Sequence, residues 1–144
     1  MNGTILAAID LEHADHNRTI LRRAHSLAVS EGAQLAVITV LPDFGMTMVA
    51  PWFKPGALDG VLTEAGAALH KAVVDVLGPE EDSRTLHVLR QGTIYQEILA
   101  AAEKYSASLI VMGAHRPDLR DYLIGPNAAR VARHAGCSVL VLRK

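Results

Sequence analysis

The stretch SLIVMGAHRPDLRDYLIGPN, residues 108–127, contains the transitions that decide the fold. Its first five residues, SLIVM, are apolar and rich in β-branched side chains, which predicts a buried strand. Gly113 ends this strand, and a polar loop follows over residues 114–124. Gly125 then opens an amphipathic helix that we expect to end near His134.

Strand, glycine, loop, glycine and helix in this order can present backbone N–H groups to an anion such as a phosphate. The free amides of a first helical turn point outward, and the helix dipole favours negative charge there. Glycine lets the backbone approach a ligand closely because it has no side chain. Glycine-rich turns also follow many parallel strands without binding anything, so the glycines alone leave open a phosphate site or a simple turn.

The rest of the chain alternates between predicted strands and predicted helices. Apolar runs indicate four further strands, at Thr4–Ile9, Gln34–Leu41, Arg84–Arg90 and Cys137–Leu142. Apolar residues at spacings of three and four indicate three further helices, at Asn17–Ser30, Leu58–Leu77 and Ile94–Tyr105. This alternation, without a domain break, predicts one α/β domain over residues 1–144. Its five-stranded parallel sheet should be doubly wound, with order 3-2-1-4-5 and helices on both faces.

In a sheet of this order, the strand order reverses between the first and the fourth strand. Ligands bind at such a reversal, beyond the carboxyl ends of the strands. The two carboxyl ends carry Asp10 and Gly113, so we expect a pocket between them. Asp10 is equally suited to cap the loop that follows the strand, and Asp15 or Asn17 to cap the first helix.

Further predictions concern packing. Residues 80–83 are expected to form a surface loop. The side chains predicted to face the core in the third strand and the following helix are Leu86, Val88, Leu89, Ile94, Ile98, Leu99 and Ala102. Residues 42–56 hold three of the six prolines, the only Trp and both Phe residues. They predict a long ordered loop that caps the core, contacts another subunit or acts as a flap.

Composition and charge restrict the class of protein. The formal net charge is −1 over 144 residues, so the overall charge does not favour nucleic acid or an anionic membrane. The single cysteine, Cys137, excludes an intrachain disulfide and fits a reducing cytoplasm. The N-terminus lacks a basic region and carries Asp10 early, and no run approaches the roughly 18 apolar residues of a membrane helix. We expect a cytoplasmic protein that neither binds nucleic acid nor inserts into a membrane.

Two segments resemble a known family. TILAAID, ending at Asp10, and GAHRPDLRDYLIGPNAARVARHAGCSVLVLR, beginning at Gly113, are similar to the first strand and the C-terminal signature of the universal stress protein family. The HRPD, YLIGPNAA and RHAGCSVLV elements are specific to it, and the resemblance covers the whole chain. It implies a small cytoplasmic α/β protein that binds ATP or AMP, with or without Mg²⁺.

The resemblance also implies which residues bind the nucleotide. Carried over by position, these are Ala8, Ile9, Asp10, Val40, Met112, Gly113, His115, Arg116, Gly125, Pro126, Asn127 and Ala128. Asp10 would lie near the adenine or the ribose, and Val40 would meet the adenine through its backbone. His115 would be either a neighbour of the phosphate or a loop hydrogen-bonding residue.

The phosphate motif departs from that of the ATP-binding members, which is similar to G-x-x-G, nine residues, then G-S/T. Arg116 stands at the second glycine, the loop to Gly125 is one residue shorter, and Pro126 replaces the hydroxyl residue. Arg116 could obstruct a phosphate, or its guanidinium could hold one in a bidentate contact. Pro126 removes one N–H, yet proline is well accepted at the first helical position. The resemblance to the HRPD branch, some members of which bind adenine nucleotide, favours binding.

Three functions are compatible with these residues. The first is a nucleotide-binding regulatory protein that acts through an unidentified protein partner. The second is a slow ATP hydrolase or nucleotidyl transferase, for which no P-loop lysine is present and only Asp10 and Asp118 offer carboxylates. The third is a dimeric signalling module of receiver type that binds no nucleotide, although its expected third-strand aspartate is replaced here by Arg90. We assign no catalytic residue and no metal ligand.

Other polar residues have structural explanations. His134 complements the dipole of its helix, and Cys137 begins a buried strand without an acid–base partner that would suggest a nucleophile. His13 and His16 flank Asp15 at a spacing that permits a metal ion, but no further ligand is evident, so we expect no metal site there.

The last predicted strand suggests an assembly. It is apolar on consecutive positions and should form an edge of the sheet, which proteins normally cover or pair. Antiparallel pairing with a second copy would satisfy both edges, and the family resemblance implies such dimers. We expect a homodimer through residues 137–143, and the apolar loop at 44–56 is a candidate second contact for a tetramer.

Overall fold

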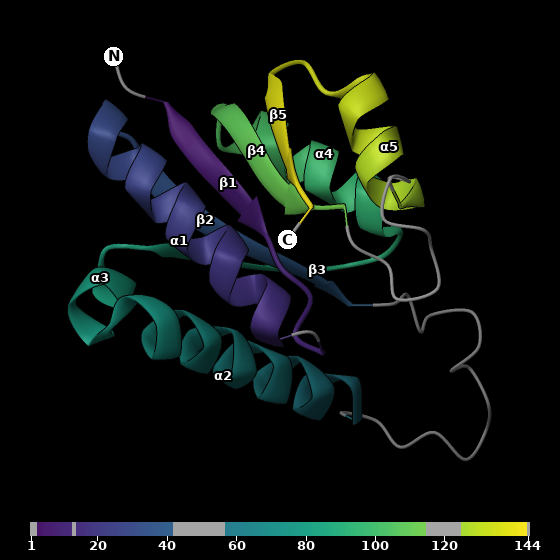
Figure 1. Ribbon diagram of the computed structural model, residues 1–144. Helices are drawn as coiled ribbons and strands as arrows, with labels where there is room; N and C mark the ends of the chain where they lie inside the picture. The colour runs from purple at the N-terminus through teal and green to yellow at the C-terminus, as the bar shows by residue number, and fades with distance from the viewer. Residues whose placement is uncertain (1–2, 13, 42–56, 115–124, 144) are drawn as a thin grey trace.

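The computed structural model describes residues 3–12, 14–41, 57–114 and 125–143, with the backbone alone for residues 57–61. A parallel sheet of order β3-β2-β1-β4-β5 forms the middle layer (Figure 1). Its strands are β1 (Thr4–Ala8), β2 (Gln34–Leu41), β3 (Leu86–Gln91), β4 (Ala107–Gly113) and β5 (Ser138–Leu142). The helices are α1 (Ala14–Glu31), α2 (Ala57–Leu77), α3 (Pro79–Ser83), α4 (Ile94–Lys104) and α5 (Pro126–His134). The predicted fold class and strand order are confirmed.

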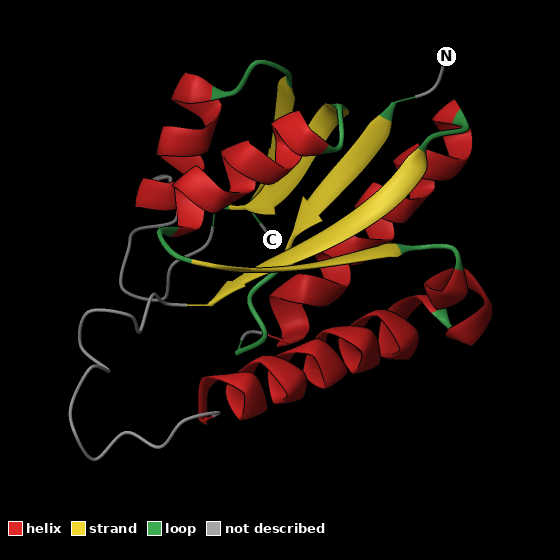
Figure 2. Ribbon diagram, turned by 180° about the vertical axis from the view of Figure 1, so that it is seen from behind, coloured by secondary structure: helices red, strands yellow, loops and turns green. Residues whose placement is uncertain are grey.

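Different helices cover the two faces of the sheet (Figure 2). Helices α1 and α2 pack on one face, where Ile5 of β1 and Leu69 of α2 belong to the same buried cluster. Helices α4 and α5 pack on the other, where Leu6 of β1 joins Val131 of α5. Successive residues of a strand point to opposite faces, so covering both faces buries residues 4–7 without interruption.

Helix α3 corrects the prediction of a surface loop at residues 80–83. Pro79 occupies the first helical position, where its missing N–H has no intrahelical partner to lose. Gly78 precedes it with a φ of 90°, a conformation that favours glycine. Asp82, within the supposed loop, is buried. A helix of five residues is too short for its hydrophobic periodicity to be recognised in a sequence.

Two side chains predicted to lie in the core are exposed instead. Leu86 and Ile94 each keep 42% of their surface accessible. Leu86 begins the edge strand β3 and Ile94 begins α4, so both lie at the margin of the packed layers. The remaining side chains of that prediction are buried or partly buried: Val88, Leu89, Ile98, Leu99 and Ala102.

Two predicted segments lie outside the described residues, the apolar loop at 42–56 and the phosphate loop at 115–124. Their predicted roles as a cap, flap or subunit contact and as a phosphate ligand stay predictions. Within the described part of the chain, no helix combines the length and the hydropathy needed to cross a bilayer.

Candidate functional site

The candidate site lies where β1 and β4 end side by side. Ala7 and Val111 are partners in the parallel ladder between the two strands, so Ala8 and Met112 follow at the same level. The chain leaving β1 enters α1 on one face, and the chain leaving β4 continues to α5 on the other (Figure 1). The helices that follow β1 and β4 thus pack on opposite faces of the sheet, as expected at a reversal of strand order.

Three predicted site residues form an apolar surface on the face covered by α4 and α5. Met112 is buried there, and Ala8 and Val40 pack against the same cluster while remaining partly exposed. Ile9, in contrast, has its side chain buried in the cluster under α1 and α2. Ile9 can therefore reach a ligand only through its backbone.

Asn17 fixes the backbone beyond β1. Its side chain is buried, its Oδ1 accepts a hydrogen bond from the Asp10 amide at 3.1 Å, and its Nδ2 donates to the Asp10 carbonyl oxygen. Helix α1 already begins at Ala14, so neither of the two predicted caps, Asp15 and Asn17, is its N-cap. Asn17 is a residue of the site that sequence reasoning missed, because a hydrogen bond across a loop leaves no periodic signal.

Asp10 shows the loop-capping role that was one of its two predicted roles. Its carboxylate is exposed, and Oδ1 accepts a hydrogen bond from the Glu12 amide at 3.0 Å. The residue before it is tied to β2, since the Ile9 amide donates to the Ile38 carbonyl at 2.9 Å. The hydroxyl of Thr39 donates to the Ile9 carbonyl at 3.1 Å. The backbone on both sides of Asp10 is thus fixed at the carboxyl end of β1.

His16 is a second residue of the site that was assigned elsewhere. It lies in the first turn of α1, and its imidazole packs directly on Gly113 at the end of β4. A Cβ on Gly113 would lie 1.7 Å from His16 Nε2 and 2.4 Å from Cδ2, so the ring occupies the space that a side chain would need. His16 therefore has a packing role at the site. The metal site that was considered and rejected beside Asp15 involves His13, which lies outside the described residues.

A backbone hydrogen bond places the N-terminus of α5 next to the end of β4. The Gly125 amide donates to the Ala114 carbonyl at 3.3 Å, and the Ala114 amide donates to the Leu142 carbonyl at 2.8 Å. Gly125 is the N-cap of α5 and carries no capping side chain, and Pro126 follows at the first helical position. Within this turn, Asn127 is partly buried and Ala128 is buried. The first helical turn thus lies beside the β4 end, an arrangement suited to an anion.

Two surface hollows lie along α1. One of about 250 Å³ lies between α1 and α2 and is lined by Leu11, which follows β1, and by Asn17 of α1. The other, of about 310 Å³, runs along the outer side of α1 between Arg18 and Arg23. Neither is lined by the end of β4. We assign the candidate site to the strand ends because several elements meet there, whereas the α1 hollow lies between long side chains of one helix.

Comparison with known proteins identifies the family. The model of the universal stress protein family matches residues 1–143. The chain belongs to this family. Universal stress protein A homolog 1 of Coxiella burnetii is 30% identical, covering 96% of this chain and 94% of that protein.

Two solved structures have the same fold as this universal stress protein. The universal stress protein from Archaeoglobus fulgidus in complex with dAMP has a TM-score of 0.69 and 22% identity, with 96% of both chains covered. A universal stress protein in complex with cAMP has a TM-score of 0.60 and 20% identity, covering 98% of this chain and 96% of that one.

Most predicted site residues of this universal stress protein lie at one end of its sheet. Ala8, Met112 and Gly113 close the two central strands, and Gly125 to Ala128 form the adjoining helical turn. His115 and Arg116 lie outside the described residues, so the predicted phosphate contacts of their side chains are not part of this geometry.

Proposed function

We propose that this universal stress protein binds an adenine nucleotide, ATP or AMP, and regulates a protein partner. The observation that carries the proposal is the hydrogen bond from Gly125 to Ala114, which brings the amides of α5 beside the end of β4. The dAMP and cAMP complexes of proteins with this fold support adenine nucleotides as the ligand class.

The residues at the site fit the parts of such a ligand. The adenine would lie against the apolar surface of Ala8, Val40 and Met112. The exposed Asp10 carboxylate would accept a hydrogen bond from a ribose hydroxyl. The phosphates would meet the amides that open α5, with Arg116 and His115 supplying positive charge or hydrogen bonds. A Mg²⁺ ion would enter with ATP, since Asp10 is the one carboxylate among the predicted site residues.

We propose a binding protein rather than an enzyme, with hydrolysis at most slow. Among the predicted site residues that the structure describes, Asp10 offers the carboxylate, and its Oδ1 is engaged by the Glu12 amide. A general base has to be within hydrogen-bond reach of an attacking water and free to accept its proton. Phosphate release from ATP that stays at the rate of the protein-free control supports this proposal. Turnover that disappears in Asp10→Asn would contradict it.

The ligand proposal is tested by calorimetry on the purified, untagged protein with ATP, AMP, adenosine and GTP. We expect ATP and AMP to bind and GTP to bind more weakly. If Arg116 holds phosphate, Arg116→Ala should weaken ATP roughly 5- to 150-fold, corresponding to about 1–3 kcal/mol, and adenosine hardly at all. If Arg116 obstructs the site, Arg116→Gly should strengthen ATP binding.

Arg22→Ala is the matched control for these variants. Arg22 lines the hollow on α1, which would attract phosphates by charge alone. The proposal predicts unchanged ATP affinity in this control. Loss of ATP binding in Arg22→Ala, or no binding of any adenine nucleotide to the wild type, would overturn the assigned site.

We also propose that the protein forms a homodimer through residues 137–143. In the described sheet, β5 is the last strand and pairs with β4, and its side chains from Val139 to Leu142 remain only partly buried. An apolar edge of this kind is normally covered or paired. Light scattering should give twice the chain mass, whereas a mass near 15.4 kDa would overturn the dimer. Val139→Lys should favour the monomer, and Leu86→Lys, at the exposed β3 edge, is the control that should not.

A further inference from the structure

At the other end of the sheet, side chains from three elements converge on one carboxylate. Asp82 of α3 lies between His70 of α2 and His87 of β3. His70 Nδ1 is 2.8 Å from Asp82 Oδ2, and His87 Nε2 is 2.6 Å from Asp82 Oδ1. The two imidazole centroids are 5.8 Å apart. His87 is the second residue of β3, so the cluster lies at the amino ends of the strands, away from the candidate nucleotide site.

The central carboxylate of this cluster is buried and held in place by its own backbone. The side chain of Asp82 is only 7% exposed, and a buried carboxylate is unfavourable unless it is paired or coordinates a metal. Its amide donates to the Gly78 carbonyl at 3.0 Å, and its carbonyl accepts from the Thr85 amide at 3.1 Å. The direction of the carboxylate is therefore set by the turns on either side of α3.

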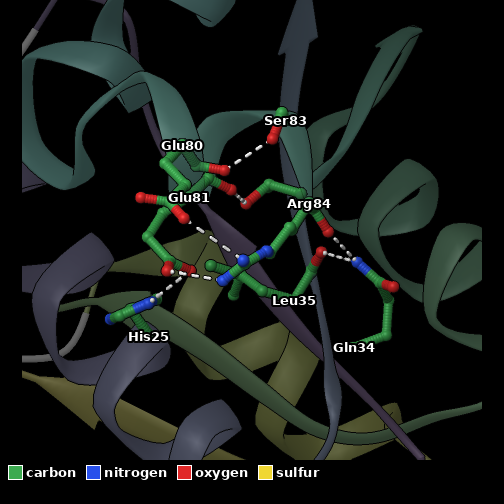
Figure 3. Close-up of polar contacts among 8 residues, drawn as sticks. His25, Gln34, Leu35, Glu80, Glu81, Ser83 and Arg84 are labelled. Carbon is green, nitrogen blue, oxygen red and sulfur yellow. Dashed lines mark hydrogen bonds and ion pairs between the residues drawn. The ribbon is translucent and has the colours of Figure 1, made fainter.

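Contacts outside the cluster fix the position of α3 (Figure 3). Glu81 pairs with His25 of α1 at 3.0 Å and with Arg84 at 3.1 Å. The Arg84 carbonyl accepts a hydrogen bond from Gln34 Nε2, at the start of β2, at 2.6 Å. These contacts attach α3 to two neighbouring elements without using Asp82. The Asp82 carboxylate thus remains directed toward the two histidines.

We propose that His70, Asp82 and His87 form a binding site for a divalent transition-metal ion, with Zn²⁺ the expected ion. Two imidazole nitrogens and one carboxylate oxygen are a donor set that Zn²⁺ accepts, with the fourth position taken by water. One ligand atom from each residue already lies within 4.8 Å of the others. Tetrahedral zinc with bonds of about 2.0–2.2 Å needs these atoms roughly 3.4 Å apart, which side-chain rotations can provide.

The exposure of the cluster provides an entry path. The side chain of His70 is 62% exposed and that of His87 is 29% exposed, so an ion can enter from solvent and keep a water ligand. Metal binding would join α2, α3 and the edge strand β3 through one ion. The alternative is a hydrogen-bonded tie, in which each imidazole donates to Asp82 and no ion is bound. The experiment has to separate these two cases.

The test uses the untagged protein of residues 1–144, treated with EDTA and then dialysed. Titration with Zn²⁺ in a calorimeter should give one saturable site, and Co²⁺ at the same site should give the intense visible absorption of a tetrahedral complex. Free Zn²⁺ at 100 times its dissociation constant should raise the Tm by about 5–10 °C, and EDTA should reverse the shift.

Two histidine variants locate the ion. His70→Ala removes a mostly exposed side chain, so the fold should persist, and Zn²⁺ affinity should fall by at least about 100-fold. His25→Ala is the matched control. His25 of α1 pairs with Glu81, which lies beside Asp82 on α3, but His25 is not part of the cluster. It should leave the Zn²⁺ affinity within about twofold of the wild type.

Three outcomes would overturn the metal site. The first is the absence of saturable Zn²⁺ binding in the wild type, which would leave the cluster as a hydrogen-bonded tie. The second is wild-type affinity in His70→Ala, which would place the ion at other histidines. The third is equal loss of affinity in His25→Ala and His70→Ala, which would show a general effect on α3 rather than lost coordination.

Discussion

The two ends of the sheet carry candidate sites that are built in opposite ways. At the carboxyl ends of β1 and β4, the site consists of backbone, glycines and a helix N-terminus. At the amino end of β3, it consists of the side chains of His70, Asp82 and His87. The first type depends on the order of the elements and on residues that leave space. The second depends on how α2, α3 and β3 pack together, and its side chains would themselves bind the ligand.

The largest effect should come from Gly113→Ala, which adds a Cβ where the His16 ring packs at the end of β4. The added Cβ would meet the His16 ring at 1.7 Å, so the ring or the strand end must move. We expect adenine-nucleotide affinity to fall by about 100-fold or more, corresponding to roughly 2.7 kcal/mol, measured by calorimetry. Gly66→Ala is the control, because a Cβ there meets nothing within 4 Å and should leave affinity unchanged.

The double variant Gly113→Ala/His16→Ala separates two reasons for that loss. Removing the His16 ring relieves the clash and should restore the Tm that Gly113→Ala lowers. Affinity should recover together with the Tm, because the space beside Gly113 is filled by the His16 ring and not by the ligand. Low affinity at a restored Tm would show instead that the nucleotide approaches the Gly113 backbone directly.

The next effect concerns the two hydrogen bonds between the Asn17 side chain and the backbone of Asp10. Asn17→Ala leaves the amide and carbonyl of Asp10 without their side-chain partners in a partly buried position. We expect a loss of about 2–3 kcal/mol in the free energy of unfolding, measured by urea denaturation, together with weaker nucleotide binding. Ser26→Ala, at an exposed position of the same helix, should change the free energy of unfolding by less than about 0.5 kcal/mol. Equal stability of the two variants would contradict the role given to Asn17.

A smaller effect concerns Cys137, which precedes β5 at the same end of the sheet as the cluster of His70, Asp82 and His87. Burial raises the pKa of its thiol, so the folded protein holds less reactive thiolate at neutral pH than the unfolded chain. Alkylation by iodoacetamide at pH 7.5 should be slower in buffer than in urea. The rate in the folded protein should rise as the pH increases above the ordinary thiol pKa. Faster reaction in the folded protein would mean an activated thiol and would disagree with this prediction.

The smallest effect is the coupling between the two sites. They lie at opposite ends of the sheet and share no residue, so substitutions in one should act independently of the other. His70→Ala should leave ATP affinity within about twofold, and Gly113→Ala should do the same for Zn²⁺ affinity. Saturating Zn²⁺ that shifts ATP affinity more than about fivefold would indicate allosteric coupling through the sheet.

The sequence predicted the carboxyl-end site because that site follows from element order. An apolar run ending at Gly113 and a helix opening at Gly125 are local features, and the strand order fixes where they meet. The backbone contacts that complete this end were not predictable. Asn17 holds Asp10 across a turn, and His16 packs on Gly113 from another element. Neither contact can be predicted from the hydrophobic periodicity of the sequence.

The amino-end cluster was missed for a different reason. Its ligands belong to α2, α3 and β3, and α3 was expected to be a surface loop. The burial of Asp82 cannot be predicted from the polar sequence around it, because it depends on which elements pack against α3. The same limit applies to Leu86 and Ile94, whose exposure depends on where the adjoining layers end. Hydrophobic periodicity predicted the helices and strands of each layer, but the exposure of residues at the ends of these elements follows only from their packing.

The nucleotide site is tested most directly by finding which backbone amides change their chemical shift when ATP is added. In a titration of ¹⁵N-labelled protein with ATP, followed by NMR, the amides of Asp10, Gly113, Gly125 and Ala128 should shift. The amides of His70 and His87, at the other end of the sheet, should not move. Shifts centred on the α1 hollow or on α3, with the amides of Gly113 and Gly125 unchanged, would contradict the nucleotide site.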